Sequence, residues 1–408
     1  MINFSGFITE QKNTHMTHIE DKVLYGGVNG TRQAILALRS LRDMLGGEHD
    51  GNVSIKWDGA PSIFCGTDPS DGKFFVAKKG IFNKNPMVYK TDADIDADTS
   101  GELAVKLKDA LKYLPALGIK GVIQGDFLFS KSDVSTAKIK GKKYLTFHPN
   151  TIVYALPIDS DGAKAVKSAK IGIVWHTSYT GNTFETMRAS YGVDVSKLKK
   201  TKAVWMQDAM LRDLTNITMS KAETEKVNKH LSQAGFIFNK IAGSTLRHLE
   251  SNQELARLIE QFNNSFVRQG QIIGDSEKHV IALINWISNR YKKEIDKRKS
   301  EKGKATQQKK LDEILSFFSN SNKTSLKYIF DLQKAIVMAK LILINNLNKL
   351  SKVNTFVKTR NGYKVTGEEG YVAIDSIGGD AVKIVDRMEF SYNNFSPDIL
   401  KGWDKPGR

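Results

Sequence analysis

Apolar residues recur at helical spacing near the start of the chain and again throughout its second half. Within residues 31–45, Ile35, Leu38 and Leu41 share one helical face, and Gly46-Gly47 predicts the end of that helix. The same spacing predicts further helices at residues 103–114, 231–238, 246–266, 280–291 and 328–347. Most of the helix is therefore expected in the second half of the chain.

Short segments rich in β-branched and aromatic residues, separated by Gly, Pro, Asn and Asp, predict strands. They lie at residues 53–56, 61–65, 74–77, 122–129, 143–147, 151–156 and 171–175, and strand character returns at 355–365, 370–374 and 381–385. Because the strands cluster instead of alternating strictly with helices, the pattern predicts an α+β fold with largely antiparallel sheet.

The change in character along the chain predicts a domain with an insertion. From about residue 196 to residue 350, glycine is rarer and helix-forming residues are more frequent. We therefore expect one domain from residues 1–195 plus 351–408, interrupted by a large helical insertion at residues 196–350.

Basic residues outnumber acidic residues by 61 to 44 among the 408 residues, which gives a formal charge of +17. A surplus of this sign favours a polyanionic partner such as nucleic acid, and a basic protein without such a partner is the alternative. Residues 290–310 contain ten basic and three acidic residues. This basic segment is interpreted either as a phosphate-binding arm or as a solvated linker.

Features of secreted and membrane proteins are not evident in the sequence. Cys65 is the only cysteine, so an intrachain disulfide is excluded. The N-terminal residues contain no basic segment followed by an apolar one, and the apolar stretch 328–347 carries Asp331, Lys334 and Lys340. We expect a cytoplasmic protein without membrane contact.

The tetrad Lys56-Trp57-Asp58-Gly59 follows a predicted strand and places an amine and a carboxylate beside a glycine turn. A lysine becomes nucleophilic only when it loses its proton, which desolvation or nearby cations favour. Phosphoryl chemistry also needs carboxylates that hold a metal ion and cations that hold phosphate oxygens. Asp126 and Glu369 are candidates for the first role and Lys383 for the second.

In their order along the chain, these elements resemble the covalent nucleotidyltransferase superfamily, which includes ATP-dependent DNA ligases, RNA ligases and mRNA-capping enzymes. The whole chain is also similar to an uncharacterised group of tailed-phage proteins. The resemblance implies an ATP-grasp-like ligase domain that uses ATP and Mg²⁺, and a location in the host cytoplasm if a phage encodes the protein. It implies that Lys56 accepts AMP on its side-chain nitrogen.

The resemblance assigns further nucleotide contacts near Lys56. Asp58 and Gly59 complete the nucleophile motif, and Asp58 is expected to orient Lys56 or the ribose. Lys78 and Lys79, before Gly80, stand where the family usually has an arginine that contacts sugar or phosphate.

The resemblance also assigns the metal ligands and the residue that stacks on the base. Asp126, where glutamate is more common, and Glu369 are expected to bind Mg²⁺. Tyr154 is expected to stack on adenine, with Phe147 as the competing choice and a core role as the alternative for both.

The last element departs from the pattern of the family. Lys383 matches the lysine that meets the α-phosphate, but Val385 stands where a second lysine is common, with Arg387 as a substitute. Residues 388–408 leave no room for the OB-fold domain of DNA ligases and capping enzymes. These departures favour an RNA-ligase-like or minimal strand-joining enzyme.

The resulting hypothesis is an ATP-dependent polynucleotide ligase, for RNA or DNA, that acts on a 5′-phosphorylated strand through lysyl-AMP. The alternative is a non-catalytic nucleic-acid-binding or virion-associated phage protein that retains the fold. A third interpretation is an enzyme that adenylylates a protein or a small molecule.

Overall fold

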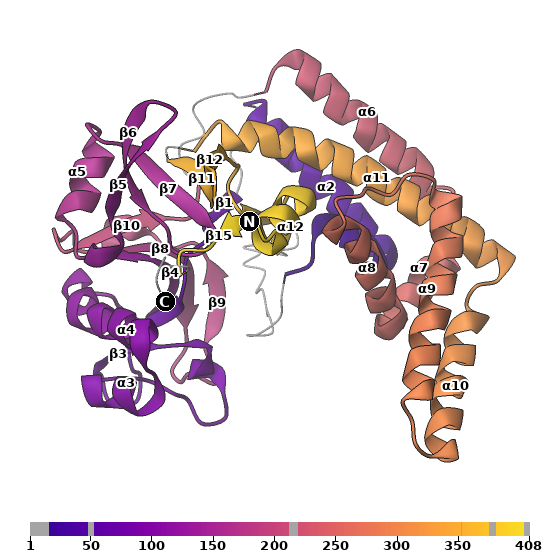
Figure 1. Cartoon of the computed structure of the whole chain (residues 1–408), viewed down its shortest axis with the longest axis horizontal. Helices are drawn as coiled ribbons and strands as arrows, with labels where there is room; N and C mark the ends of the chain where they lie inside the picture. The colour runs from indigo at the N-terminus through magenta and orange to yellow at the C-terminus, as the bar shows by residue number, and fades with distance from the viewer. Residues whose placement is uncertain (1–15, 48–52, 212–218, 352, 375–380, 404–408) are drawn as a thin grey trace, which may run out of the picture.

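The computed structural model describes residues 16–47, 53–211, 219–351, 353–374 and 381–403. Within these residues the fold is α+β, with three β-sheets on one side of the molecule and a body of long helices on the other (Figure 1). This confirms the predicted fold class at the level of secondary structure. Among the described helices, none combines the length and the apolar character that crossing a membrane requires.

The helical body is built from six helices of the second half of the chain together with two N-terminal ones. Capping supports their starts: Ser220 and Glu223 form a capping box, and Asn252 caps the helix that follows it. The helices are α1 (Lys22–Tyr25), α2 (Gly27–Leu45), α6 (Lys221–Phe238), α7 (Gly243–Ser251), α8 (Gln253–Arg268), α9 (Ser276–Asp296), α10 (Glu301–Ser316) and α11 (Asn320–Asn348).

Two sets of contacts cross the predicted domain boundaries. Helix α2 packs against α6, α7 and α11, so the N-terminal helix belongs to the helical body. Strand β10 (Val204–Asp208) lies within the predicted insertion but pairs with β8 (Ile171–Thr180) in a sheet. The packing of α2 and the pairing of β10 both depend on contacts between segments that are distant in sequence. Hydrophobic periodicity within one segment does not predict such contacts.

Residues 290–310 do not form a linker. They cover the end of α9 and most of α10, which run antiparallel as a helical hairpin that projects from the rest of the helical body (Figure 1). Arg298 and Lys299 are exposed at its tip, where the two helices connect.

The three sheets differ in size and position. The small sheet has the order β1-β13-β14, the central sheet β10-β8-β4-β2-β3 with β9 beside β8, and the outer sheet β12-β11-β7-β6-β5 with β15 beside β11. All pairs between these named strands are antiparallel except β10–β8. The other bounds are β1 (Val53–Lys56), β2 (Ser62–Thr67), β3 (Phe74–Ala77), β4 (Val122–Ser130), β5 (Ser135–Ile139), β6 (Lys142–Phe147), β7 (Ile152–Pro157), β9 (Arg188–Tyr191), β11 (Asn354–Thr359), β12 (Gly362–Val365), β13 (Gly370–Ile374), β14 (Ala381–Ile384) and β15 (Ile399–Leu400).

Shorter helices flank the sheets. Helices α3 (Asp92–Asp98) and α4 (Gly101–Tyr113) pack beside the central sheet, and α5 (Asp161–Ser168) packs beside β6 and β7 of the outer sheet. Helix α12 (Arg387–Phe395) follows the small sheet and contacts α8 of the helical body.

The small sheet joins the two halves of the molecule because side chains alternate between its faces. Its apolar face packs into the core of the helical body through Val53, Tyr371, Ala373, Val382 and Ile384. Its other face carries Ser54, Lys56, Val372 and Lys383, which line a cavity toward the central sheet.

A buried ionic network fixes the helical body to the end of the small sheet. Lys340 of α11 donates to both carboxylate oxygens of Glu20, at 2.7 and 2.8 Å, and both side chains are almost completely buried. Arg387, just after β14, donates to Asp21 at 2.7 Å and approaches Glu20 at 3.4 Å. Burial alone would raise the pKa of Glu20, but the charges of Lys340 and Arg387 hold it below the ordinary value.

Replacing Lys340 by methionine is expected to lower the free energy of unfolding by about 3 kcal/mol, because Glu20 would keep a buried charge with one cation removed. The control is Lys327→Met on the same helix, since Lys327 is half exposed and lies 3.8 Å from Glu277. The control should change stability by less than about 0.5 kcal/mol. Urea unfolding of both variants measures the difference, and equal stabilities would contradict the role of the network.

Candidate functional site

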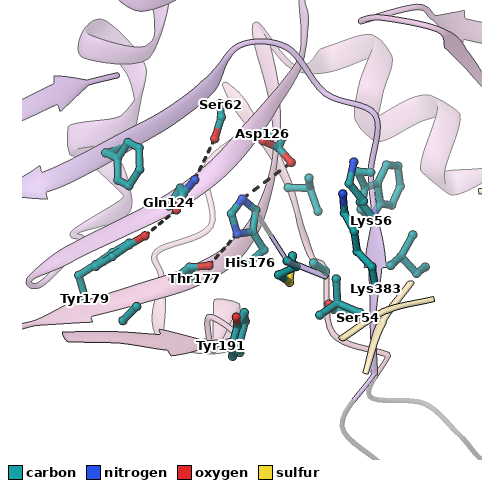
Figure 2. Close-up of a pocket in the computed structure, with 18 of the residues that line it drawn as sticks. Ser54, Lys56, Ser62, Gln124, Asp126, His176, Thr177, Tyr179, Tyr191 and Lys383 are labelled. Atoms are coloured by element: carbon teal, nitrogen blue, oxygen red, sulfur yellow. Dashed lines mark hydrogen bonds and ion pairs between the residues drawn. The ribbon is translucent and has the colours of Figure 1, made fainter. Parts of the chain in front are cut away.

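A cavity of about 330 Å³ lies between the polar face of the small sheet and the central sheet (Figure 2). Its volume falls in the range of small-molecule sites in proteins, which begins at about 300 Å³. Of the residues expected at a nucleotide site, four line this cavity: Lys56, Lys79, Asp126 and Lys383.

One wall of the cavity is cationic. Lys56 ends β1 and Lys383 lies on β14, and Figure 2 shows their side chains next to each other. Burial and the neighbouring charge of Lys56 lower the pKa of Lys383. Lys79, from the short 3₁₀ turn Lys79–Phe82, adds a third, exposed cation at the cavity. Two amines held this close favour an anionic ligand.

Glu369 is the ion-pair partner of Lys56, through Oε1. It is among the residues that line a second, much smaller cavity of about 10 Å³, which has room for about one water molecule. Burial raises the pKa of Glu369 to about 7, although the charge of Lys56 opposes this shift. Glu368 beside it is also buried, and burial raises its pKa to about 7. Glu369 thus contacts the amine of Lys56 instead of lining the main cavity.

The carboxylate of Asp58 faces away from the main cavity. Its oxygens accept hydrogen bonds from Asn150 Nδ2 at 2.6 Å and from the backbone amides of Thr151 and Ile152 at 2.6 and 2.8 Å. Asp58 is 4% exposed. The hydrogen-bonding capacity of Asp58 is therefore used to fix the turn after Lys56 to the start of β7, and of its two expected roles this arrangement favours orienting Lys56 over orienting the ribose.

Gly59 allows this turn to approach β4 closely. A Cβ atom at Gly59 would lie 2.6 Å from Cβ of Asp126 and 3.0 Å from the carbonyl oxygen of Phe127. A larger residue would therefore push the turn away from Asp126. Gly59 affects the cavity through this contact with Asp126.

Tyr154 and Phe147 do not line the cavity, so the expected stacking on adenine is not available to either. Both are buried in the core between the central and outer sheets, with ring centroids 5.4 Å apart. The hydroxyl of Tyr154 accepts a hydrogen bond from the amide of Asp58 at 2.7 Å. The aromatic residues that line the cavity are Trp57, Phe64, Tyr179 and Tyr191.

Lys78 and Arg387 also lie outside the cavity. Lys78 forms an ion pair with Asp98 at 2.8 Å and lies 5.9 Å from the ring centre of Tyr89. Arg387 forms ion pairs with Glu20 and Asp21. It therefore does not take the place of the second lysine that is common in the nucleotidyltransferase superfamily. Lys78 and Lys79 are adjacent in sequence, but only Lys79 lines the cavity.

The opposite wall of the cavity is polar and includes His176, the residue directly after the predicted strand 171–175. His176 of β8 lies next to Asp126 of β4, with Nε2 3.8 Å from Oδ2 (Figure 2). Gln124 accepts a hydrogen bond from Tyr179 at 2.7 Å and donates one to Ser62 at 3.0 Å. Alternation along β4 could have indicated that Gln124 and Asp126 share a face. His176 had no such signal, because β4, the strand that brings Asp126 beside it, is not adjacent to β8 in sequence.

The expected Mg²⁺ ligands fit a cation by their chemistry, since carboxylate oxygens are ligands that Mg²⁺ prefers. Asp126 lines the cavity, and its charge contributes to the raised pKa of Glu369. In the described part of the chain, no group of three or more His, Cys, Asp or Glu residues is arranged to hold a metal ion. A cation here would need further ligands from phosphate or water, as is usual for nucleotide-bound Mg²⁺.

Comparison with known proteins gives a family but no function. Residues 13–398 match a family that is described as a family of unknown function (DUF6267). No curated protein and no solved structure matches the chain. The chemistry of the cavity must therefore indicate the function.

Replacing Asp58 by asparagine is expected to lower the free energy of unfolding by about 2 kcal/mol, because a neutral oxygen accepts more weakly from the amides of Thr151 and Ile152 and the new NH₂ group would face the donor Asn150 Nδ2. The control is Asp161→Asn, since Asp161 is exposed at the start of α5 and should tolerate the change within about 0.5 kcal/mol. Urea unfolding measures both. An Asp58→Asn variant as stable as its control would show that the buried carboxylate does not hold the turn.

Proposed function

We propose that this chain, which belongs to the DUF6267 family, is an ATP-dependent nucleotidyltransferase that joins polynucleotide strands through AMP bound to Lys56. The observation that carries the proposal is the placement of Lys56, whose amine is at the cavity, ion-paired with Glu369 and next to Lys383. A nucleophilic lysine needs a nearby proton acceptor and a cationic surrounding, and this arrangement supplies both. The motif order described above adds the resemblance to nucleotidyltransferases.

The first step follows from these contacts. The ammonium group of Lys56 gives one proton to Glu369, and the lone pair of Nζ attacks the α-phosphorus of ATP. The bond from that phosphorus to the β-phosphate oxygen breaks, and pyrophosphate leaves with the second proton of Nζ. Lys383 and Lys79 balance the phosphate charge, and a divalent cation held with Asp126 would supply further charge stabilisation.

In the following steps the AMP moves to the nucleic acid. An oxygen of the 5′-phosphate attacks the phosphorus of lysyl-AMP, the P–N bond breaks, and Lys56 regains protons from solvent. A 3′-hydroxyl then attacks the 5′-phosphorus, loses its proton to solvent and displaces AMP. For the base of ATP, the partly exposed ring of Tyr191 offers the aromatic surface that the buried Tyr154 does not.

The helical hairpin α9–α10 is the surface we assign to the nucleic acid. Lys297 and Lys304 pair with acidic neighbours in the hairpin itself, at 2.9 and 2.7 Å. Among the described residues, Arg298 and Lys299 have no acidic partner at ion-pair distance, and both are exposed. Cations that are not neutralised within the protein are the ones that bind phosphates most effectively.

The first test is labelling with ATP that carries ³²P at the α-phosphate, in Mg²⁺ or Mn²⁺, followed by a denaturing gel. Wild type should carry a covalent label and Lys56→Arg none, while Lys383→Met should label about a hundredfold more slowly. The matched control is Lys78→Met, which should label at the wild-type rate because Lys78 lies outside the cavity. Absence of label from wild type in both metals would favour a non-catalytic nucleic-acid-binding protein.

Changing Lys297, Arg298 and Lys299 together to glutamine is expected to weaken binding of a 5′-phosphorylated strand and to reduce its salt dependence. For a single strand the logarithmic salt slope should fall by about 1.4, since the contacts of Arg298 and Lys299 with phosphate contribute about 0.7 each. The control changes Lys138, Lys142 and Lys143, which are equally exposed on β5 and β6, to glutamine. Fluorescence anisotropy at several salt concentrations measures the slopes, and equal slopes for both triple variants would exclude the hairpin as the binding surface.

A further inference from the structure

An irregularity in the central sheet places His176 in the cavity. In the pairing of β4 with β8, Gln124 lies opposite Thr177 and Gly125 lies opposite Trp175, so His176 is an extra residue. This is a β-bulge, a feature that redirects side chains and is frequent beside active sites. As a result, the consecutive residues His176 and Thr177 both line the cavity, whereas Trp175 packs into the core.

The bulge is fixed by its own hydrogen bonds. The carbonyl oxygen of His176 accepts a hydrogen bond from the amide of Gly192 at 2.8 Å, and that of Trp175 accepts one from Ala209 at 2.9 Å. The backbone that carries the imidazole is thus held from two sides. The ring is 27% exposed and faces the cavity.

The two nitrogens of the imidazole have different surroundings. Nδ1 lies 2.8 Å from the hydroxyl oxygen of Thr177, a distance typical of a hydrogen bond. Nε2 lies 3.8 Å from Oδ2 of Asp126, which is too long for a direct hydrogen bond. A hydrogen on Nδ1, donated to Thr177, leaves a lone pair on Nε2. Metal-binding histidines show this arrangement, in which the second nitrogen donates to a neighbouring oxygen.

We propose that Asp126 Oδ2 and His176 Nε2 bind one divalent cation between them, and that the imidazole makes the site prefer Mn²⁺ to Mg²⁺. An imidazole nitrogen is a good ligand for transition metals, whereas Mg²⁺ prefers oxygen. Both side chains are partly exposed to the cavity, so water or phosphate can complete the coordination. Gln124 is already engaged by Ser62 and Tyr179, which leaves two protein ligands on this wall.

The site would serve the nucleotidyl transfer proposed above, since it faces Lys56 and Lys383 across the same cavity. Binding of the cation itself requires neither ATP nor a reaction. The inference changes the metal assignment from the pair Asp126 and Glu369 to the pair Asp126 and His176, with Glu369 kept as the partner of Lys56.

The test is a titration of the full chain with Mn²⁺ without nucleotide, in which electron paramagnetic resonance measures free Mn²⁺. Wild type should bind one Mn²⁺ that His176→Gln and Asp126→Asn each bind at least about tenfold more weakly. The matched control is His230→Gln on α6, a partly buried histidine outside the cavity, which should bind as wild type does. Circular dichroism establishes that each variant is folded.

Two further measurements test whether the imidazole of His176 binds the metal ion and whether the site prefers Mn²⁺ to Mg²⁺. Pulsed electron paramagnetic resonance should detect an imidazole ¹⁴N coupled to Mn²⁺ in wild type and in His230→Gln, and not in His176→Gln. Mg²⁺ should displace Mn²⁺ from His176→Gln at lower concentration than from wild type. Equal Mn²⁺ affinity of wild type and His176→Gln, or no nitrogen coupling in wild type, would overturn the proposal.

The same samples separate this inference from the proposed function. Lys56→Arg should bind Mn²⁺ as wild type does, because Lys56 is not a ligand. Normal Mn²⁺ binding with nitrogen coupling, but without covalent labelling by ATP, would retain the metal site and reject the transferase.

Discussion

The small sheet has the helical core on one face and the polar cavity on the other, and the geometry of the site depends on this division. Its three strands are short, yet one face is anchored in the helical core while the other presents Lys56 and Lys383 to the cavity. The alternation of side chains along a strand makes this division strict, since a shift of one residue in register would bury the lysines and expose the apolar set. The position of the lysine amines is therefore set by hydrophobic packing on the far side of the sheet.

A second constraint acts on the turn that follows Lys56. Asp58 accepts three hydrogen bonds from residues 150–152, which lead into β7, and Gly59 lets the turn lie against Asp126. In the motif Lys56-Trp57-Asp58-Gly59, the last two residues therefore mainly hold the backbone turn after Lys56 in place. The resemblance to nucleotidyltransferases is compatible with this, because a lysine that reacts with phosphate must be held in place as well as activated.

Local sequence patterns predicted many of the helices and strands, but they predicted only some of the residues that line the cavity. Strands β1 and β13 have their expected bounds and helix α11 contains the expected helix, although it begins at Asn320, because periodicity and glycine turns are local signals. The predicted helix 246–266 is instead two helices that meet at Asn252, whose side chain caps the second. Tyr154 was assigned to the nucleotide from its place on a strand, yet tertiary packing buries it, and the bulge that directs His176 into the cavity arises only from pairing between β4 and β8.

The pairing of Lys56 with Gly370 has a consequence for how the protein is made. Lys56 leaves the ribosome before helices α6 to α11, whereas Glu369 and Lys383 follow only after these helices have been synthesised. Closing so long a loop is entropically costly, so the small sheet is expected to form late. During translation, the lysine amine therefore remains without its carboxylate partner until the strands that follow the helical body have been synthesised.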